Sequence, residues 1–351
     1  MSLVDRLLRA NIRSLTPYAS ARSETMENDV VFLDANENAF ASNAPDALGR
    51  YPDPLQNELK KVVGKVRRIS PDRIFVGNGS DEAIDLMIRA FCHPGRDEVM
   101  IMPPTYGMYE VMAAINDVTV NSVPLDAGFN VDLDLVRSRL TRHTRIVFLC
   151  SPNNPTGNSL DPEHVARLLE WFDGFVVIDE AYIDFSKESG WLSRLSQYEN
   201  LVVLQTLSKA WGLAAIRIGM AFASSDVIAV LNRIKPPYNV SWLSQSVAID
   251  TVGNPETMRR HVDQIIAERK WLETALSDLD VVESVFPSEA NFILVRFRDA
   301  AKVLSYLRSN GIIVRDRSSM PGCENSLRIT VGTPEQNRQL LDVFAAWEVT
   351  T

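Results

Sequence analysis

Lys209 is the residue whose type and setting point most directly to covalent chemistry. It follows the apolar run 201–204 and lies within the stretch 206–213, Thr-Leu-Ser-Lys-Ala-Trp-Gly-Leu. A lysine at the end of a buried strand loses its proton more readily than one in water, and the neutral amine attacks carbonyl carbons. Hydroxyl residues precede it and Arg217 follows it, so we expect an anionic ligand in the same pocket. The alternative is a lysine that is merely buried and paired.

Two other polar residues also follow apolar runs. Asp179 ends the run 175–178, and open α/β sheets place ligands at the carboxyl ends of their strands. A carboxylate there keeps a pyridine nitrogen protonated, although a helix N-cap or an ion-pair partner explains Asp179 equally well. Asn154 lies in the turn 151–157, rich in proline and asparagine, where its amide can meet a phenolic oxygen. An ordinary polar loop is the alternative there, and the Asn154–Pro155 bond is a candidate for cis geometry.

The glycine turn at 77–79 predicts an anion site. Gly79, Ser80 and Asp81 join the apolar run 74–76 to a helical pattern, so the free backbone amides of a helix N-terminus are available to a phosphate. Ser80 or Asp81 would also serve as an ordinary N-cap. Arg217 suits a phosphate better than a lysine does; an exposed arginine at the start of a strand is the alternative.

Together these residues match the separate parts of one molecule, pyridoxal phosphate. Lys209 suits its aldehyde, Asp179 its ring nitrogen, Asn154 its phenolic oxygen, and Arg217 with the glycine turn its phosphate. Tyr106 follows two prolines and can stack on a flat ring, although such a tyrosine more often belongs to a core or a rim. The sequence therefore predicts a single cofactor site at the carboxyl ends of several strands.

The elements that must position this site are short apolar runs alternating with longer helical patterns. We expect helices at 80–92, 106–115 and 162–172, and strands at 74–76, 98–102, 119–123, 145–150, 175–178, 201–205 and 218–223. This alternation, with strands that are apolar throughout, predicts an α/β fold with a mostly parallel, doubly wound sheet covered by helices on both faces.

The pattern changes at the double proline 236–237, which breaks helix and strand alike. A long helix is expected over 255–276, with Asn254 as N-cap and Pro255 at its first position. Strands at 281–285, 292–297 and 327–331 and a helix at 300–309 follow. We therefore expect a large domain at 46–237, a smaller α+β domain at 238–351, and an arm at 1–45 that belongs partly to the small domain through a strand at 31–33.

Composition restricts the class of protein. The chain has 351 residues and a net charge of −9, from 36 basic and 45 acidic residues, which disfavours nucleic acid as a partner. Residues 1–13 lack the pattern of a signal peptide, and no apolar run approaches the length of a membrane span. The three cysteines, Cys92, Cys150 and Cys323, are widely spaced and lack metal-ligand spacing, so we expect no metal site and reduced thiols in a cytoplasmic protein.

These motifs resemble the fold-type I pyridoxal-phosphate enzymes of the class I/II aminotransferase group. Four further segments are similar to the histidinol-phosphate aminotransferase family: 15–18 (Leu-Thr-Pro-Tyr), 33–38 (Leu-Asp-Ala-Asn-Glu-Asn), 50–54 (Arg-Tyr-Pro-Asp-Pro) and 327–333 (Leu-Arg-Ile-Thr-Val-Gly-Thr). The resemblance covers nearly the whole chain. It departs at Ala39, where the family often has proline, and at Ala215, where it often has glycine; the first departure bears on the substrate loop.

The resemblance implies transfer of the amino group of L-histidinol phosphate to 2-oxoglutarate, giving imidazole acetol phosphate and L-glutamate by a ping-pong reaction in histidine biosynthesis. It implies that Lys209 carries pyridoxal phosphate as a Schiff base and shuttles the proton, that Asp179 pairs with the pyridine nitrogen, and that Asn154 and Tyr182 hold the phenolic oxygen. Around the phosphate and ring it places Gly79, Ser80, Asp81, Tyr106, Thr206, Ser208 and Arg217. Tyr51 would reach the phosphate of the neighbouring subunit in a homodimer with shared sites. Tyr18, Asn36, Arg315 and Arg328 would bind substrate, with Arg328 accepting a phosphate and a carboxylate in turn.

Other functions remain open at this stage. A broad aromatic aminotransferase and a decarboxylase of phosphorylated amino acids share the scaffold, and the cofactor residues do not separate them. A non-catalytic pyridoxal-phosphate-binding regulatory module usually carries a DNA-binding segment, and we find none in this acidic chain. An α/β protein without a cofactor would be colourless and insensitive to borohydride.

Overall fold

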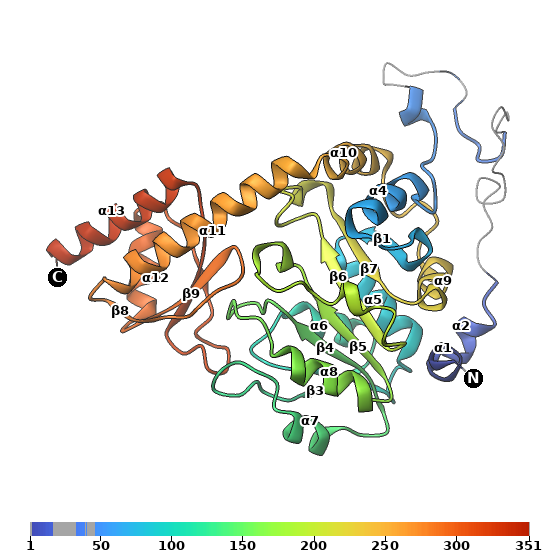
Figure 1. Ribbon diagram of the computed structural model, residues 1–351, viewed down its shortest axis with the longest axis horizontal. Helices are drawn as coiled ribbons and strands as arrows, with labels where there is room; N and C mark the ends of the chain where they lie inside the picture. The colour runs from blue at the N-terminus through green and yellow to red at the C-terminus, as the bar shows by residue number, and fades with distance from the viewer. Residues whose placement is uncertain (1, 17–32, 39, 41–45, 351) are drawn as a thin grey trace.

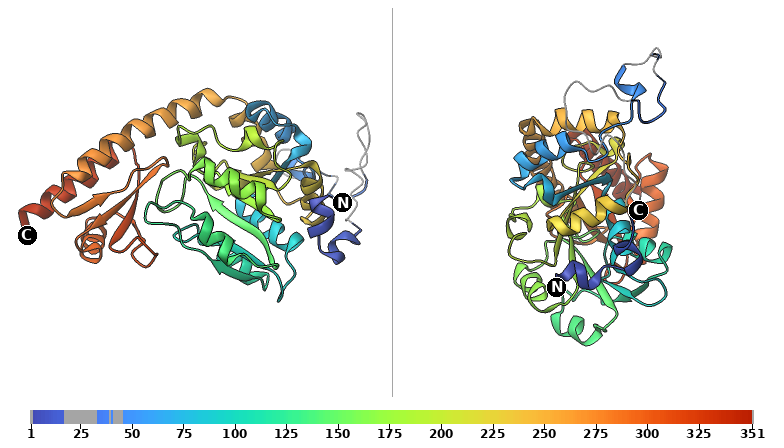
Figure 2. Two further views of the ribbon diagram at one scale, coloured as in Figure 1. Left: turned by 60° about the horizontal axis from the view of Figure 1, so that its bottom comes forward. Right: turned by 90° about the vertical axis from the view of Figure 1, so that its right-hand side faces the viewer.

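The computed structural model describes residues 2–16, 33–38, 40 and 46–350, which form two sheets with helices packed around them (Figure 1). The expected site residue Tyr18, the departure at Ala39 and most of the predicted strand at 31–33 lie outside the described residues. The two termini lie at opposite ends of the molecule in Figure 1 and in the left view of Figure 2.

The larger sheet has seven strands in the order β1-β7-β6-β5-β4-β2-β3. Its strands are β1 (Ile74–Asn78), β2 (Glu98–Ile101), β3 (Thr119–Ser122), β4 (Thr144–Cys150), β5 (Phe175–Asp179), β6 (Leu201–Thr206) and β7 (Ile218–Phe222). Only β7 runs antiparallel to its neighbours, β1 and β6. The predicted α/β fold with a mostly parallel sheet is therefore confirmed, and all seven strand predictions agree with the structure to within a residue or two.

Both faces of this sheet are buried, which explains why its central strands are apolar throughout. Side chains alternate along a strand, so Val147 and Leu149 of β4 join one core, with α4 (Asn57–Arg67) and α8 (Pro162–Trp171). Ile146 and Phe148 join the other core, with α5 (Ser80–Phe91), α6 (Met108–Ile115) and α9 (Ser225–Ile234). Helix α7 (Leu133–Arg139) completes the layer of α8. The sequence analysis did not predict α4, α7 or α9.

The smaller sheet has four antiparallel strands in the order β10-β11-β9-β8. They are β8 (Val282–Val285), β9 (Phe292–Phe297), β10 (Arg315–Asp316) and β11 (Ser326–Thr330). One face packs on α11 (Pro255–Ser277), α12 (Ala300–Ser309) and α13 (Pro334–Thr350). The long helix α11, orange in Figure 1, runs from the large sheet to the small one. Pro255 begins α11 as predicted, but the Asn254 side chain does not cap it and donates instead to the Asp250 carbonyl.

Two segments differ from the expected domain assignment. Leu3, Val4 and Leu7 of α1 (Leu3–Leu7) pack into the core of the large sheet, close to α2 (Ala10–Arg13), and not with the small sheet. Helix α10 (Trp242–Val252) also packs on the large-sheet side, against α4, although it lies after residue 237. Each of these helices buries apolar side chains, and the sequence pattern alone does not show which of the two sheets will cover them. The division at residues 45 and 237 otherwise remains a prediction.

Candidate active site

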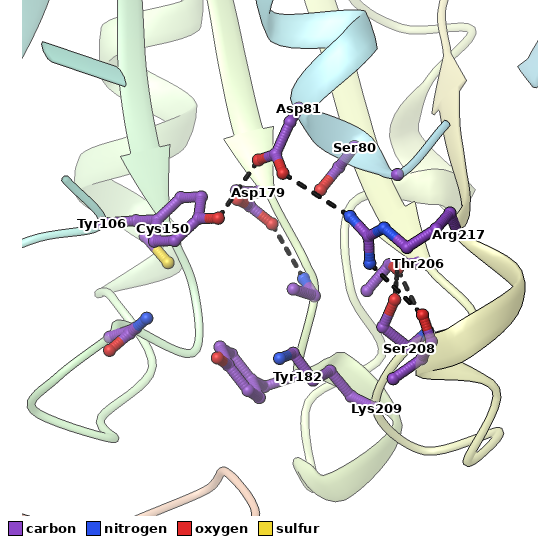
Figure 3. A pocket seen from close by; sticks show the side chains of 14 residues that line it. Ser80, Asp81, Tyr106, Cys150, Asp179, Tyr182, Thr206, Ser208, Lys209 and Arg217 are labelled. Carbon is purple, nitrogen blue, oxygen red and sulfur yellow. Dashed lines mark hydrogen bonds and ion pairs between the residues drawn. The ribbon is translucent and has the colours of Figure 1, made fainter. Parts of the chain in front are cut away.

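A cavity opens at the carboxyl ends of β4, β5 and β6, where the predicted cofactor residues meet (Figure 3). Parallel strands bring their carboxyl ends to one edge, so residues far apart in sequence become neighbours. The lining consists of Gly79, Ser80, Asp81, Tyr106, Cys150, Asn154, Asp179, Ala181, Tyr182, Thr206, Ser208, Lys209, Ala214 and Arg217.

Lys209 lies half-buried just beyond β6. Its Nζ lies 5.7 Å from the centroid of the Tyr182 ring and has no hydrogen-bonding partner in the described part of the chain. Burial, followed by the charges of Arg328 and Arg217, lowers the pKa of the Lys209 amine. A lower pKa leaves a larger fraction of the amine unprotonated near neutral pH. Only the unprotonated amine attacks a carbonyl carbon or accepts a proton.

Asp179 is the last residue of β5 and is buried. Its Oδ2 accepts a hydrogen bond from the Tyr109 hydroxyl at 2.9 Å, and its Oδ1 accepts one from the Ala181 amide at 3.0 Å. Burial raises the pKa of the Asp179 carboxyl to about 6, although both hydrogen bonds lower it. Such a carboxylate is strongly stabilised by any cation that enters the cavity.

The amino end of α5 and the start of β7 form an anion cradle. The N-cap of α5 is Gly79, at φ +77°, and no side chain caps the helix, so its first amides are open to a ligand. A Cβ on Gly79 would lie 2.7 Å from Arg217 Nη2, and one on Gly219 would lie 2.1 Å from the Ser80 amide nitrogen. Only glycine allows these backbone segments to approach so closely.

Hydroxyl groups and Arg217 complete the cradle. Thr206 Oγ1 lies 3.0 Å from Ser208 Oγ and accepts a hydrogen bond from the Ser208 amide at 3.1 Å. Arg217 has a left-handed backbone, φ +56°, and its Nη2 lies 3.8 Å from Asp81 Oδ2. Asp81 also accepts a hydrogen bond from the Tyr106 hydroxyl at 3.1 Å (Figure 3). These contacts position donors around a space large enough for a phosphate.

The small sheet contacts two residues that line the cavity, Asn154 and Tyr182. Arg328 of β11 donates a hydrogen bond to Asn154 Oδ1, which leaves the Asn154 amide nitrogen free to donate to a ligand. Tyr182 packs edge-on against Phe292 of β9, with ring centroids 5.0 Å apart, and the Arg328 guanidinium lies over the same phenylalanine ring. Both sheets therefore define the geometry of the site.

Comparison with known proteins identifies the family to which this chain belongs. The family model for aminotransferase class I and II matches residues 22–344. The chain belongs to this aminotransferase family. Its relatives include a histidinol-phosphate aminotransferase of Cytophaga hutchinsonii, 50% identical over 344 residues that cover 98% of this chain and 99% of the relative. At that likeness over the full length, this aminotransferase belongs to the histidinol-phosphate aminotransferase group.

Solved structures share the fold of this aminotransferase at lower sequence identity. The histidinol-phosphate aminotransferase from Clostridium acetobutylicum superposes with a TM-score of 0.80 at 24% identity, covering 87% of this chain and 92% of that one. The enzyme from Sinorhizobium meliloti, solved in complex with pyridoxal-5'-phosphate, gives a TM-score of 0.77 at 22% identity over 86% of this chain and 84% of that one. The fold is that of the fold-type I aminotransferases.

Among the described residues, four predicted site residues lie outside the cavity lining: Arg328, which contacts the lining residue Asn154, and Tyr51, Asn36 and Arg315. Tyr51 is half exposed and stacks on Tyr238, with ring centroids 4.5 Å apart. Asn36 is exposed, with φ +54°, and Tyr18 is outside the described residues. Arg315 of β10 is exposed and lies directly opposite Arg328 across the strand pair. The roles of these residues and of Tyr18 therefore remain predictions.

Three residues in or near the aminotransferase site were not predicted from the sequence. Tyr109 is fully buried and donates to Asp179; its spacing of one helical turn from Tyr106 was the available signal. Cys150 lines the cavity beneath Asp179 at the end of β4. Buried Lys235 donates to the Pro54 carbonyl at 2.6 Å, so it ties the segment near Tyr51 to the segment that follows α9.

Two kinds of feature are absent from the described part of the chain. It contains no cluster of histidine, cysteine, aspartate or glutamate side chains that could hold a metal ion. None of its helices combines the length and apolarity needed to cross a bilayer. The three cysteines are buried and free.

Proposed function

We propose that this aminotransferase uses pyridoxal 5'-phosphate to move the amino group of L-histidinol phosphate to 2-oxoglutarate, giving imidazole acetol phosphate and L-glutamate. One observation carries the proposal: a lysine with a lowered pKa, a buried carboxylate and an uncapped helix N-terminus with an arginine line one cavity. The 50% identity to a histidinol-phosphate aminotransferase over nearly the full length supports the choice of substrate.

The residues present fit the cofactor. The cradle of Gly79, Ser80, Ser208 and Arg217 offers amides, hydroxyls and a guanidinium to a phosphate, and its glycines leave no room for side chains that would fill it. Asp179 would lie against a protonated ring nitrogen, and Tyr106 would cover the ring. When bound, the cofactor withdraws electrons from the bonds at the substrate's α-carbon.

The chain's own groups then handle protons and charge. Lys209 supplies the amine that attaches the cofactor, and its lowered pKa suits it to move a proton at the substrate's α-carbon. Asp179 holds the proton on the ring nitrogen, because an ionised carboxylate buried without a cation is costly. The Asn154 amide, oriented by Arg328, and the Tyr182 hydroxyl would donate to the phenolic oxygen of a bound cofactor.

We expect substrates to bind on the side of the cavity where Arg328 contacts Asn154. Arg328 offers its guanidinium to the phosphate of histidinol phosphate in one half-reaction and to a carboxylate of glutamate or 2-oxoglutarate in the other, because an arginine fork matches both groups. Tyr18, Asn36 and Arg315 would complete the substrate site.

A second copy of the chain would complete the active site. Tyr51, Trp242 and Leu243 expose 50%, 38% and 56% of their surface, and they gather where the 50s loop meets α10. We expect these aromatic and aliphatic side chains to be buried in a homodimer in which Tyr51 reaches the partner's cofactor phosphate. The free, buried cysteines support a reducing, cytoplasmic location.

An amino-donor screen tests the proposal. Purified protein is incubated with 2-oxoglutarate and one donor at a time, and glutamate is measured. Histidinol phosphate should be the best donor, ahead of phenylalanine, tyrosine and threonine phosphate. No glutamate from histidinol phosphate would refute the proposed substrate, and release of carbon dioxide from threonine phosphate would favour the decarboxylase.

A lysine variant tests the attachment of the cofactor. Wild type should be yellow and should fix the cofactor irreversibly on borohydride reduction. Lys209→Ala should abolish both fixation and transamination, whereas Lys65→Ala, at an exposed lysine on α4, should change neither. Fixation that persists in Lys209→Ala would show that another lysine is the attachment point.

A further inference from the structure

Three arginines lie on one face of the β10–β11 ribbon. Arg315 lies directly opposite Arg328 in the antiparallel register. The Arg317 amide extends the ladder by one bond, to the Ser326 carbonyl at 2.9 Å. Side chains two residues apart on a strand point to the same face, so Arg317 joins Arg315 and Arg328. The opposite face carries Leu327 and Ile329, which pack beneath the helices of the small sheet.

The nearest acidic residue in sequence is Asp316, whose carboxyl pKa is lowered by hydrogen bonds from Ser318 and, more weakly, by the charge of Arg317. None of the three arginines forms an ion pair within the described residues, and the Nε atoms of Arg317 and Arg328 are buried without a hydrogen-bonding partner there. Burial, followed by the charges of Arg328 and Arg315, lowers the pKa of the Arg317 guanidinium. Asp316 points to the other face, where its Oδ1 accepts from the Ser318 amide at 2.8 Å. Like charges directly opposite in a ribbon are destabilising, so folding alone does not explain the cluster.

The cluster borders the active-site cavity. Arg328 donates to Asn154, which lines that cavity. Burial raises the pKa of the Tyr182 hydroxyl, and the positive charges of Arg328 and Arg317 lower it, so both guanidinium groups lie near this residue of the cavity lining. Arg328 therefore connects the cluster to the cavity through Asn154, and Arg315 lies beside Arg328 in the ribbon.

We propose that Arg317 is a third substrate-binding arginine, which with Arg315 and Arg328 makes this subsite selective for a dianionic phosphate over a single carboxylate. The inference rests on the proposed function and adds Arg317 as the residue that discriminates. A phosphate monoester carries about −1.5 to −2 charges at neutral pH and three acceptor oxygens, whereas a carboxylate carries one charge and is satisfied by one guanidinium fork. Three unpaired guanidinium groups therefore match the phosphate better.

A chemical double-mutant cycle on the holoenzyme tests Arg317. The wild type and Arg317→Gln are assayed with L-histidinol phosphate and with unphosphorylated L-histidinol, each with 2-oxoglutarate. Loss of one charge-assisted contact should lower kcat/KM for histidinol phosphate by about 10- to 100-fold, while kcat/KM for histidinol changes less than about threefold. Arg317→Lys, which keeps the charge without the fork, should recover part of the loss.

The matched control is Arg308→Gln, which removes the same charge from an exposed position on α12 of the same domain. It should leave both donors unchanged, which excludes an effect of net charge. If Arg317→Gln lowers kcat/KM equally for both donors, Arg317 has a structural role and the inference is wrong. The inference is also wrong if kcat/KM falls for neither donor.

Failure of the proposed function is a separate outcome. It would appear as wild-type protein that does not turn over histidinol phosphate at all. The arginine cluster is then tested with inorganic phosphate, titrated by calorimetry into holoenzyme, whose cofactor occupies the other phosphate site. Phosphate binding that weakens about tenfold or more in Arg317→Gln but not in Arg308→Gln would support the anion subsite, and equal binding in all three proteins would refute it.

Discussion

The buried carboxylate of Asp179 should make the cofactor-free protein less stable as the pH rises, and Asp179→Asn should remove that effect. The substitution is nearly isosteric and removes the charge. The asparagine oxygen can keep the hydrogen bond from the Ala181 amide, and the Tyr109 hydroxyl can turn to accept from the new amide group. The cost in packing should therefore be small.

The magnitude follows from the pKa of the Asp179 carboxyl, which burial raises from 3.8 to about 6. Because the folded state binds the proton more tightly than the unfolded state, the free energy of unfolding falls as the pH rises between these two values. A shift of about 2 units corresponds to about 3 kcal/mol in total, of which about half is lost between pH 5 and pH 8. Above the folded pKa the penalty stays constant.

Urea denaturation of cofactor-free wild type and Asp179→Asn at pH 5 and pH 8 measures the effect. The stability advantage of the variant should grow by roughly 1.5 kcal/mol between the two pH values. Glu180, with a pKa that burial raises to about 7, is present in both proteins and cancels in the difference. An advantage that is constant or shrinks as the pH rises would refute the reasoning. In the holoenzyme the same substitution should abolish most of the transamination activity, because the ring nitrogen loses its partner.

Two further predictions concern the cradle and the large domain. Gly219→Ala places a Cβ 2.1 Å from the Ser80 amide nitrogen, so cofactor affinity should fall at least about tenfold and the free energy of unfolding by about 1–3 kcal/mol. The control is Gly107→Ala, whose Cβ would have nothing within 4 Å. In a fluorescence titration with the cofactor, this control should match wild type. Arg67 binds Asp184 through two hydrogen bonds of 2.8 and 2.9 Å, and Arg67→Met should cost about 2 kcal/mol because both side chains are mostly buried. The exposed Lys61–Glu58 pair is the comparison: Lys61→Met should cost less than about 0.5 kcal/mol in the same urea experiment, and equal costs would contradict the argument from burial.

Much of the cavity follows from patterns local in the chain. An apolar run that ends in Asp179, a turn rich in proline and asparagine around Asn154, and a glycine turn before a helix each predict one piece of the site. Parallel strands then bring these pieces to one edge of the sheet. For this reason the prediction of a mostly parallel sheet was enough to bring together most of the residues that line the cavity. Helix α4 begins without a side-chain cap and α7 has only 7 residues, so their signals in the sequence are weak, whereas α9 has a Ser224 cap and an apolar face and was detectable.

The identity of the contacts could not be predicted from sequence. Tyr109 binds Asp179 from a helix 70 residues away, and Arg328 reaches Asn154 across 174 residues from another sheet. The placement of α1 and α10 against the large sheet depends on which core accepts their apolar faces, and several arrangements satisfy the same helical period.

The sequence by itself predicted most of the residues that line the cavity and the strand ends that present them, because side-chain type, apolar period and turn composition are local properties. The tertiary structure alone decided which charges remain unpaired. Arg317 is one arginine among many in the sequence, and only the register of β10 on β11 places it beside Arg315 and Arg328 with no carboxylate partner in the described chain. Burial and counter-charge depend on contacts that form only when the chain folds, so the arginine cluster that we propose as a phosphate subsite is visible only in three dimensions.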